Sequence, residues 1–261
     1  MFSQSPSALT ICSDAYTEPL SSGASQALDR PVIAHLFPLD VVAAAELRGE
    51  QHSAIVPWLG CGAFPGWSSR RVYDFVRGRL CAQEALAVLR AEQHELLGIA
   101  ADRRVAWPNG LVGSITHTDR YAAAVVAKRE NVRALGLDAE VVGRVGNDLW
   151  PLVFTANETA WLRISQRVST LDFATLVFSA KEAFYKFQFE LTGAWLDFLD
   201  VNVAVDGDWH ACSGTFRLDV IRKDGVSRRL GMTYQGSYLF DDRYVITGIT
   251  LMARKKCPEE S

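Results

Sequence analysis

The segment that most constrains this chain is residues 178–186, where Glu182 and Lys186 stand four positions apart among apolar and aromatic residues. Apolar side chains recur at helical spacing through it, which predicts a helix over residues 171–191 with a buried face made of Leu176, Ala180, Ala183, Phe184, Phe187 and Leu191. On a surface helix, an acid and a base four apart form an ion pair worth only about 0.2–0.5 kcal/mol. Lys186 lies between bulky aromatic residues, where a charge without a partner is poorly stabilised. This segment alone leaves an ion pair and a functional site equally open.

A second charged segment lies upstream, in residues 135–140, Leu-Gly-Leu-Asp-Ala-Glu. On a strand, Gly136, Asp138 and Glu140 point to one face and the apolar residues to the other. Two carboxylates then project together beside a glycine that leaves room for a ligand. Magnesium prefers a few carboxylates, water and substrate phosphates, and Glu182 could add a third carboxylate. The alternative is an exposed strand edge with two solvated acids.

Charge and cysteine usage limit the partners and the compartment. The 261 residues suffice for one large domain or two small ones, and the net charge of −3 predicts neither nucleic acid nor a membrane as a partner. Any phosphate site must therefore be a local basic cluster. The five cysteines are scattered, without the spacing of a zinc site or a disulfide framework. Residues 1–30 lack the basic start of a signal peptide, so we expect a flexible arm on a cytoplasmic protein.

The hydrophobic pattern runs from a helix and strands to helices and strands again, which predicts an α+β protein of two similar lobes joined near Arg133. Besides residues 171–191, led by Ser169, Thr170 or Asp172 as the N-cap, helices are expected over residues 68–97 and 154–164. Strands are expected over residues 31–37, 113–117, 121–127, 135–142, 201–205, 214–221, 229–234 and 244–253. The polar residues 128–133 should form a turn that pairs strands 121–127 and 135–142 antiparallel.

Small polar residues gather just before and within the strand at residues 113–117, among them Ser114, Thr116 and His117. Hydroxyl groups and the N–H groups near glycines are suited to hold a phosphate or the edge of an adenine. A lone histidine at a strand end is more often structural, and alternation places His117 on the face of Ile115. Arg71 and Arg79 could donate bidentate hydrogen bonds to a phosphate, or could form a solvated helix face.

Thr155 and Glu158 also allow two interpretations. They fit a capping box, in which Thr155 caps a helix and Glu158 reaches back to the backbone of the cap. A chemical role for Glu158 is the alternative, and the sequence does not decide between the two.

In their order and spacing, three of these segments resemble the motifs of the Sfp-type 4′-phosphopantetheinyl transferases, in the branch of the enterobactin synthetase component D enzymes. The first motif is similar to residues 107–117, which include Trp107 and Pro108, and the second to residues 136–140. The third, an aromatic-Ser-x-Lys-Glu-Ala-x-x-Lys helix, is similar to residues 178–186 at every position. Arg70-Arg71 and Gly78-Arg79 resemble the basic N-terminal helix of that branch. The resemblance covers about residues 68–203.

The resemblance implies a pseudo-twofold fold with the active site in the cleft between the lobes. It implies that Asp138, Glu140 and Glu182 hold Mg²⁺ against the pyrophosphate of coenzyme A and that Lys186 stabilises the leaving group. The groups expected to meet the nucleotide are Arg71, Arg79, Pro108, Ser114, Thr116 and His117. Glu158 corresponds to a proposed general base of some relatives, and Lys181 is expected to face outward or to be structural.

The implied reaction moves the 4′-phosphopantetheine group of coenzyme A to a serine of an acyl or peptidyl carrier protein and releases adenosine 3′,5′-bisphosphate. We expect a monomer divided into residues 1–30, an N-terminal lobe of residues 31–133 and a C-terminal lobe of residues 134–261. A magnesium-dependent nucleotide phosphohydrolase and a non-catalytic module that binds coenzyme A or a carrier are the alternatives. Replacing Asp138 or Glu182 by alanine should abolish transfer and leave the fold largely intact.

Overall fold

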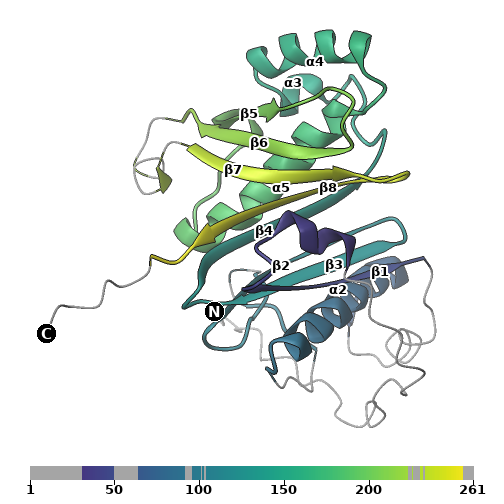
Figure 1. The fold of residues 1–261 in the computed structure, drawn as a ribbon. Helices are drawn as coiled ribbons and strands as arrows, with labels where there is room; N and C mark the ends of the chain where they lie inside the picture. Colours follow the sequence, from purple (N-terminus) through teal and green to yellow (C-terminus); the bar gives the residue numbers. More distant parts are fainter. Residues whose placement is uncertain are drawn as a thin grey trace, which may run out of the picture.

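The structure is a computed structural model that describes residues 31–49, 64–91, 96–100, 102, 104–222, 225, 230–231 and 233–254. The expected N-terminal arm at residues 1–30 lies outside the described residues. The described chain forms two antiparallel sheets, each covered by one long helix, and the sheets lie one above the other in Figure 1. The α+β fold with two lobes is therefore confirmed. None of the described helices has the length and apolar character to cross a membrane.

The N-terminal lobe is built on a three-stranded sheet. A 3₁₀ helix η2 (Val32–Leu36) precedes β1 (Val42–Arg48), α2 (Ser69–Val88), β2 (Leu111–Thr118) and β3 (Tyr121–Lys128), and the strand order is β1-β3-β2. The face toward α2 is made of small residues, including Ala122 and Ala124 on β3, which pack against Ala82 and Ala85 of α2. Small side chains on both surfaces let the helix lie close to the sheet.

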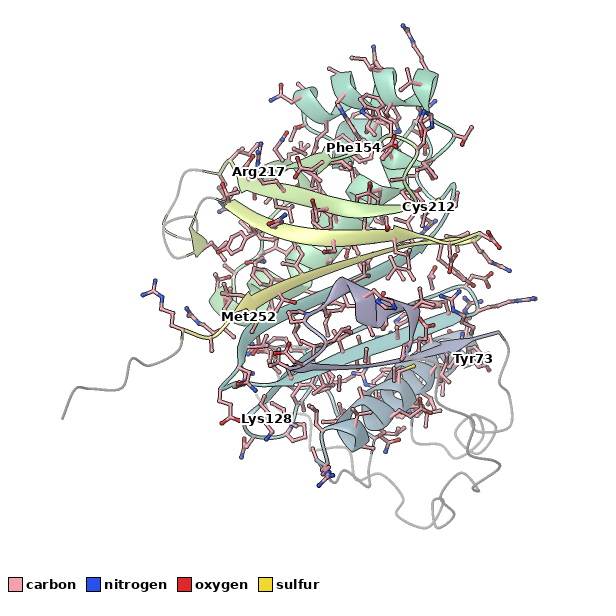
Figure 2. The ribbon with its side chains drawn as sticks, in the orientation of Figure 1. Tyr73, Lys128, Phe154, Cys212, Arg217 and Met252 are labelled. Carbon is pink, nitrogen blue, oxygen red and sulfur yellow. The ribbon has the colours of Figure 1, made fainter. Side chains whose placement is uncertain are left out.

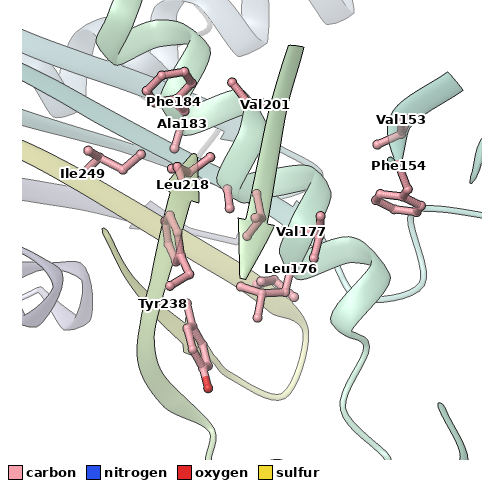
Figure 3. Packing of buried hydrophobic residues seen from close by; sticks show 14 of the residues in the cluster. Val153, Phe154, Leu176, Val177, Ala183, Phe184, Val201, Leu218, Tyr238 and Ile249 are labelled. Atoms are coloured by element: carbon pink, nitrogen blue, oxygen red, sulfur yellow. The ribbon is translucent and has the colours of Figure 1, made fainter. Parts of the chain in front are cut away.

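The C-terminal lobe holds five strands and the helices α3 (Trp150–Val153), α4 (Ala156–Val168) and α5 (Phe173–Thr192). The strands are β4 (Val132–Val141), β5 (Val201–Asp206), β6 (Ser213–Val220), β7 (Thr233–Phe240) and β8 (Tyr244–Met252), in the order β4-β8-β7-β6-β5, and the 3₁₀ helix η3 (Phe198–Asp200) precedes β5. Leu176, Val177 and Phe184 of α5 pack with Leu218 and Ile249 of the sheet (Figure 3). Burial of each such side chain contributes about 1.5–3 kcal/mol, which fixes α5 on the sheet.

Helix α5 begins and ends where the sequence predicts. The Asp172 carboxylate, one of the three candidate N-caps, accepts a hydrogen bond from the Thr175 N–H. Gly193 ends the helix in the left-handed conformation, with φ of 63°, which glycine adopts at little cost. Alternation along β4 is also confirmed. Leu135, Leu137 and Ala139 enter the core shared with β1 and β3, whereas Asp138 points toward α5.

The predicted antiparallel pairing of residues 121–127 with 135–142 is wrong. Strand β3 pairs with β1 and β2, and β4 pairs with β8, so the chain changes sheets directly after Lys128, which is labelled in Figure 2. The crossing is held at both ends, because the Arg129 N–H donates to Gly110 O and the Ala253 N–H donates to Asn131 O. A short polar turn looks the same in sequence whether or not its flanking strands pair.

Three further boundaries differ from the expectations. Residues 32–36 form a 3₁₀ helix rather than a strand, the helix expected over residues 68–97 ends at Val88, and the strand expected over residues 229–234 is β7, which begins only at Thr233. Arg90 has a positive φ of 56°, which ends α2 although apolar residues continue beyond it. The apolar residues Leu96 and Leu97, which suggest a longer helix, are buried but lie beyond the end of α2.

The two lobes meet at β2 and β4, which are joined through side chains. The Leu137 N–H donates to Ser114 Oγ at 3.0 Å, and the Ala139 N–H donates to Thr116 Oγ1 at 3.1 Å. The two hydroxyl groups thus accept bonds that a neighbouring strand would accept in a continuous sheet. The result is a hydrogen-bonded seam directly beside Asp138.

Candidate active site

Asp138 lies at the centre of the site, where β2, β4 and α5 meet. Its side chain is buried, and Oδ1 accepts hydrogen bonds from Lys186 Nζ at 2.8 Å and from Thr116 Oγ1 at 3.3 Å. Oδ2 accepts a hydrogen bond from Ser179 Oγ at 2.9 Å. A buried carboxylate with three donors contributes to stability as well as to the site. Asp138 thus has a structural role besides its expected role in the site, and the expectation that Asp138→Ala leaves the fold largely intact stays a prediction.

Lys186 is held against β4 while part of its side chain stays exposed. Its ammonium group donates to Leu137 O at 3.0 Å as well as to Asp138, and its side chain is 30% exposed. An ammonium group has three N–H donors. Two are used in these bonds between described residues, which leaves one for an anionic ligand in the cleft.

Glu140 and Glu182 lie near Asp138 and interact with it electrostatically. Burial, followed by the charges of Asp138 and Glu182, raises the pKa of Glu140 to about 7, against the lowering effect of Arg144 and Lys186. Burial and the charge of Asp138 also raise the pKa of Glu182. The three acids therefore share one region of negative potential, as the sequence predicts. Over the described residues, no three His, Cys, Asp or Glu side chains are close enough to form a ready-made metal site.

The sequence predicts that Gly136 leaves room for a ligand, and this prediction is wrong. A Cβ atom at this position would lie 2.1 Å from the carbonyl oxygen of Ala183 and 2.9 Å from Cβ of Phe187. The missing side chain instead lets α5 approach β4 closely. That approach is what brings Lys186 within hydrogen-bonding distance of Asp138.

Two cavities border the site. One of about 440 Å³ lies between the lobes, lined by Gly113, Ser114 and Ile115 of β2, by Tyr185, Lys186, Phe189 and Glu190 of α5, and by Asp102, Arg104, Val105, Trp107 and Trp195. The other, of about 210 Å³, is mostly apolar and is lined by Glu182, Leu196, Phe198 and their neighbours. Tyr185 and Trp195 line both cavities and contact each other edge to face, with ring centroids 4.8 Å apart. They form a wall shared by the two spaces.

His117 and Arg79 lie on the N-terminal side of the site. Partial burial lowers the pKa of the His117 imidazole, the charges of Lys186 and Arg79 lower it further, and those of Asp74 and Asp138 act in the opposite direction. His117 keeps part of its surface exposed to solvent, whereas Arg79 is buried, with Nε donating to Leu97 O and the guanidinium 3.9 Å from the centre of the Phe75 ring. Burial lowers the pKa of Arg79 to about 10. The structure thus brings His117 and Arg79 together.

The other residues predicted to contact the nucleotide are Arg71, Pro108, Ser114 and Thr116, and their positions do not identify a nucleotide site. Arg71 is exposed and stacks over Trp67, with its guanidinium carbon 4.1 Å from the ring centre. Pro108 starts a turn that is closed by the Leu111 N–H donating to its carbonyl oxygen, and its neighbour Trp107 lines the larger cavity. Ser114 and Thr116 use their hydroxyl groups in the seam between the lobes. Their contact with a nucleotide, like those of Arg71 and Pro108, stays a prediction.

Glu158 lies in a buried ion pair rather than beside the other acids. The capping box is confirmed, with the Thr155 N–H donating to Glu158 Oε2 and the Glu158 N–H donating to Thr155 Oγ1. Lys181 Nζ donates to the same Oε2 at 2.7 Å, and the Val203 N–H donates to Oε1 at 2.6 Å. Lys181 is buried, so of the two expectations for it the structural one is correct. A catalytic role for Glu158 has no support from this arrangement.

Sequence reasoning missed the role of Ser179. Its hydroxyl group donates to Asp138 Oδ2 and also forms a hydrogen bond with Thr247 Oγ1 at 2.9 Å. The signal was present, since a serine on the apolar face of a helix must find a partner when it is buried. The partner itself, on β4, could not be identified from spacing along one segment.

The fold and the site define a two-lobed α+β protein whose charged cleft is suited to an anionic ligand. Family comparisons agree in both lobes. Residues 67–127 match the 4′-phosphopantetheinyl transferase N-terminal domain, and residues 134–238 match the 4′-phosphopantetheinyl transferase superfamily.

Curated relatives extend this match over most of the chain. The 4′-phosphopantetheinyl transferase Npt of Nocardia iowensis is 34% identical over 69% of this chain and 82% of its own length. The 4′-phosphopantetheinyl transferase Svp of Streptomyces mobaraensis is 34% identical over 74% of this chain and 77% of its own. Enterobactin synthase component D of Salmonella typhi is 32% identical over 45% of this chain and 48% of its own. The chain belongs to the 4′-phosphopantetheinyl transferases, and it is an enzyme.

Proposed function

We propose that this enzyme transfers the 4′-phosphopantetheine group of coenzyme A to a serine of an acyl or peptidyl carrier protein in a Mg²⁺-dependent reaction. The serine oxygen forms a bond to the β-phosphorus of coenzyme A, and the bond from that phosphorus to the bridging pyrophosphate oxygen breaks. Adenosine 3′,5′-bisphosphate leaves with the bonding electrons, and the serine proton passes to a base. The family comparisons favour this reaction over a nucleotide phosphohydrolase and over a non-catalytic binding module.

One observation carries the proposal: Lys186 of the C-terminal lobe and Thr116 of the N-terminal lobe both donate to Asp138. A cation and a carboxylate are thereby fixed at the boundary of the lobes, where the larger cavity lies. Phosphoryl transfer asks a protein mainly to position the reactants and to stabilise developing negative charge. Lys186, with one N–H left for a ligand, is placed to donate to the pyrophosphate as adenosine 3′,5′-bisphosphate leaves.

The acids fit a magnesium ion by their chemistry. Burial, followed by the charge of Asp138, raises the pKa values of Glu140 and Glu182, as expected for carboxyl groups held close together. Mg²⁺ usually binds through one or two carboxylates, several waters and the substrate phosphates, so a preassembled cage of protein ligands is not required. When bound, the ion would neutralise charge on the pyrophosphate. Asp138 would then share its negative charge with the ion as well as with Lys186.

The two cavities suit the two ends of coenzyme A. The larger one has aromatic walls from Trp107 and Phe189 and is lined by Lys186, whose charge acts on His117, so it fits an adenine nucleotide. The smaller one borders Glu182 and fits part of the pantetheine arm. Both are lined by Tyr185, one residue before Lys186, so the pyrophosphate would lie near the wall that they share.

Glu182 is the residue that we propose as the acceptor of the serine proton. It is only half-buried and lines the smaller cavity, where the reacting end of the phosphopantetheine would lie. Glu158, the other carboxylate considered, is almost fully buried and already accepts three hydrogen bonds. Removing a proton there would require breaking the buried ion pair with Lys181.

Intact mass spectrometry tests the reaction directly. An apo carrier protein incubated with the enzyme, coenzyme A and Mg²⁺ should gain the mass of one phosphopantetheine group, and a chelator should prevent the gain. Carriers from fatty-acid, polyketide and siderophore assembly should be compared, since relatives named enterobactin synthase component D point to siderophore carriers. No mass gain on any carrier, with coenzyme A still bound, would contradict the proposal.

We expect the enzyme to act as a cytoplasmic monomer, which light scattering and cell fractionation can check.

A further inference from the structure

Helix α2 runs beside the outer end of β2, and two contacts fix how they are aligned. Gly78 faces Ile115, because a Cβ on Gly78 would lie 2.6 Å from Cγ2 of Ile115. Two turns earlier on the helix, Arg70 Nη2 lies 4.0 Å from Asp119 Oδ1, just beyond the end of β2. The helix and the strand therefore run antiparallel between these two points.

Asp74 and His117 are the midpoints of this alignment. Asp74 lies four residues from Gly78 and four from Arg70, while His117 lies two residues from Ile115 and two from Asp119. Four helical residues rise about 6 Å and two strand residues about 6.8 Å, so the steps match. Alternation puts His117 on the same face of β2 as Ile115, the face toward α2. Asp74 and His117 therefore lie on the facing surfaces of α2 and β2, although no hydrogen bond or ion pair joins them in the described part of the chain.

The Asp74 carboxylate is arranged to accept one more hydrogen bond. Its Oδ2 accepts a bond from Arg70 Nε at 3.0 Å, and its side chain is 17% exposed. Its Oδ1 is buried and has no hydrogen-bond partner among the residues that the structure describes. A buried acceptor without a partner costs free energy, so a donor is expected close by. The charge of Asp74 acts on the His117 imidazole, together with Arg79 of the same helix, Lys186 of α5 and Asp138 of β4.

From this geometry we propose that Asp74 is a positioning residue. A rotation of the imidazole lets one ring nitrogen of His117 donate to the unpartnered Oδ1 of Asp74 and turns the other ring nitrogen toward the phosphate of the bound nucleotide. Arg70 holds the outer oxygen of Asp74, so Arg70, Asp74 and His117 form a chain that leads from the surface into the cleft. The proposal rests on the proposed function, because coenzyme A is the ligand that His117 would contact. It adds a residue of α2 that does not itself touch the ligand.

The test in the free enzyme uses ¹⁵N NMR of the histidine side chains. The unaltered enzyme should show one fixed neutral tautomer for His117, and Asp74→Ala should show exchange between both tautomers. Asp74→Asn keeps the shape of the side chain and guards against misfolding, and it should give an intermediate spectrum. An unchanged His117 signal in Asp74→Ala would overturn the proposal. This readout needs no ligand, so it stands apart from the proposed function.

Calorimetric titration with coenzyme A gives the second readout. Asp74→Ala and His117→Ala should each weaken binding about tenfold, the usual effect of losing a hydrogen bond to a charged group. The double variant should be no weaker than His117→Ala alone, whereas independent, additive losses would overturn the positioning role. Glu84→Ala, on an exposed part of the same helix, is the matched control and should bind normally. Failure of the unaltered enzyme to bind coenzyme A would contradict the proposed function, while the NMR result would still decide the pairing.

Discussion

Helix α5 carries two lysine ion pairs of nearly equal length, and they differ in almost every other respect. Lys181 Nζ lies 2.7 Å from Glu158 Oε2, and both side chains are 1% exposed. Lys186 Nζ lies 2.8 Å from Asp138 Oδ1, with exposures of 30% and 6%. Lys181 also donates to Val153 O and Phe198 O, so its three N–H donors are all used. We call Lys181–Glu158 the sealed pair, because both side chains are buried, and Lys186–Asp138 the open pair, because Lys186 is partly exposed.

The difference shows what separates a structural charge from a functional one on the same helix. The sealed pair joins α3, α4, α5 and the segment before β5, and Glu158 also accepts the Val203 N–H at the free edge of β5. Within the described part of the chain, all three N–H donors of Lys181 are used, so none is left there for a ligand. The open pair spans the seam between the lobes and keeps one N–H for the cleft. Distance alone does not distinguish them, whereas exposure and unused hydrogen-bonding capacity do.

Breaking the sealed pair should give the largest effect on stability. Lys181→Met leaves Glu158 buried without its cation, which we expect to lower the free energy of unfolding by about 3–5 kcal/mol. Urea denaturation followed by circular dichroism measures this. The double variant Lys181→Met/Glu158→Gln removes both charges and should recover part of the loss. A single variant as stable as the unaltered enzyme would show that water or another donor reaches Glu158.

Breaking the open pair should affect activity first. Lys186→Ala removes the donor to the leaving group, and we expect kcat to fall about 10²–10³-fold. Stability should fall less than in Lys181→Met, because Asp138 keeps its bonds from Thr116 and Ser179. The mass-spectrometric transfer assay and urea denaturation, run on the same samples, give both values. A loss of stability equal to that of Lys181→Met would remove the distinction between the two pairs.

The sequence predicted the faces on which the residues of the open pair lie better than the environment of the sealed pair, although it predicted neither contact. Period-two spacing was enough to place Asp138 and Glu140 on one face, and helical spacing placed Glu182 and Lys186 together, because each set lies within one local element. The environment of Lys181 depends on Val153, Glu158 and Phe198, which come from three separate segments. No local pattern encodes their meeting, so its burial could not be read from the helix alone.

The same limit explains the errors in the fold. Strand β4 pairs with β8, near the other end of the chain, with Asp138 opposite Thr247. The sequence favours β3 as the partner of β4, because only a short polar turn separates them, but β3 pairs with β1 and β2 instead. Gly136 was read as room for a ligand for a similar reason. Only the position of α5 shows that the space is filled by the backbone at Ala183.

The position of α5 on β4 can be altered without touching either ion pair. Gly136→Ala places a methyl group against the carbonyl oxygen of Ala183, and we expect a loss of about 1–3 kcal/mol from overpacking. Because the open pair crosses from α5 to β4, transfer activity should fall in the folded fraction as well. Gly78→Ala is the matched variant in the other lobe, where the obstacle is the side chain of Ile115. It should cost less, since a side chain can move more easily than backbone. Equal losses would show that the backbone at Ala183 resists a methyl group no more than the side chain of Ile115 does.

The smallest effect is expected at the seam. Thr116→Val keeps the shape of the side chain but removes the donor to Asp138 and the acceptor for the Ala139 N–H. Leaving that buried N–H without a partner should cost about 1–2 kcal/mol. Since Lys186 still holds Asp138, kcat should change less than in Lys186→Ala, and the sealed pair should be unaffected. Hydrogen exchange of the Ala139 and Val203 amides separates the two regions: faster exchange at Ala139 alone supports a local seam, whereas faster exchange at both would mean that the seam and the sealed pair open together.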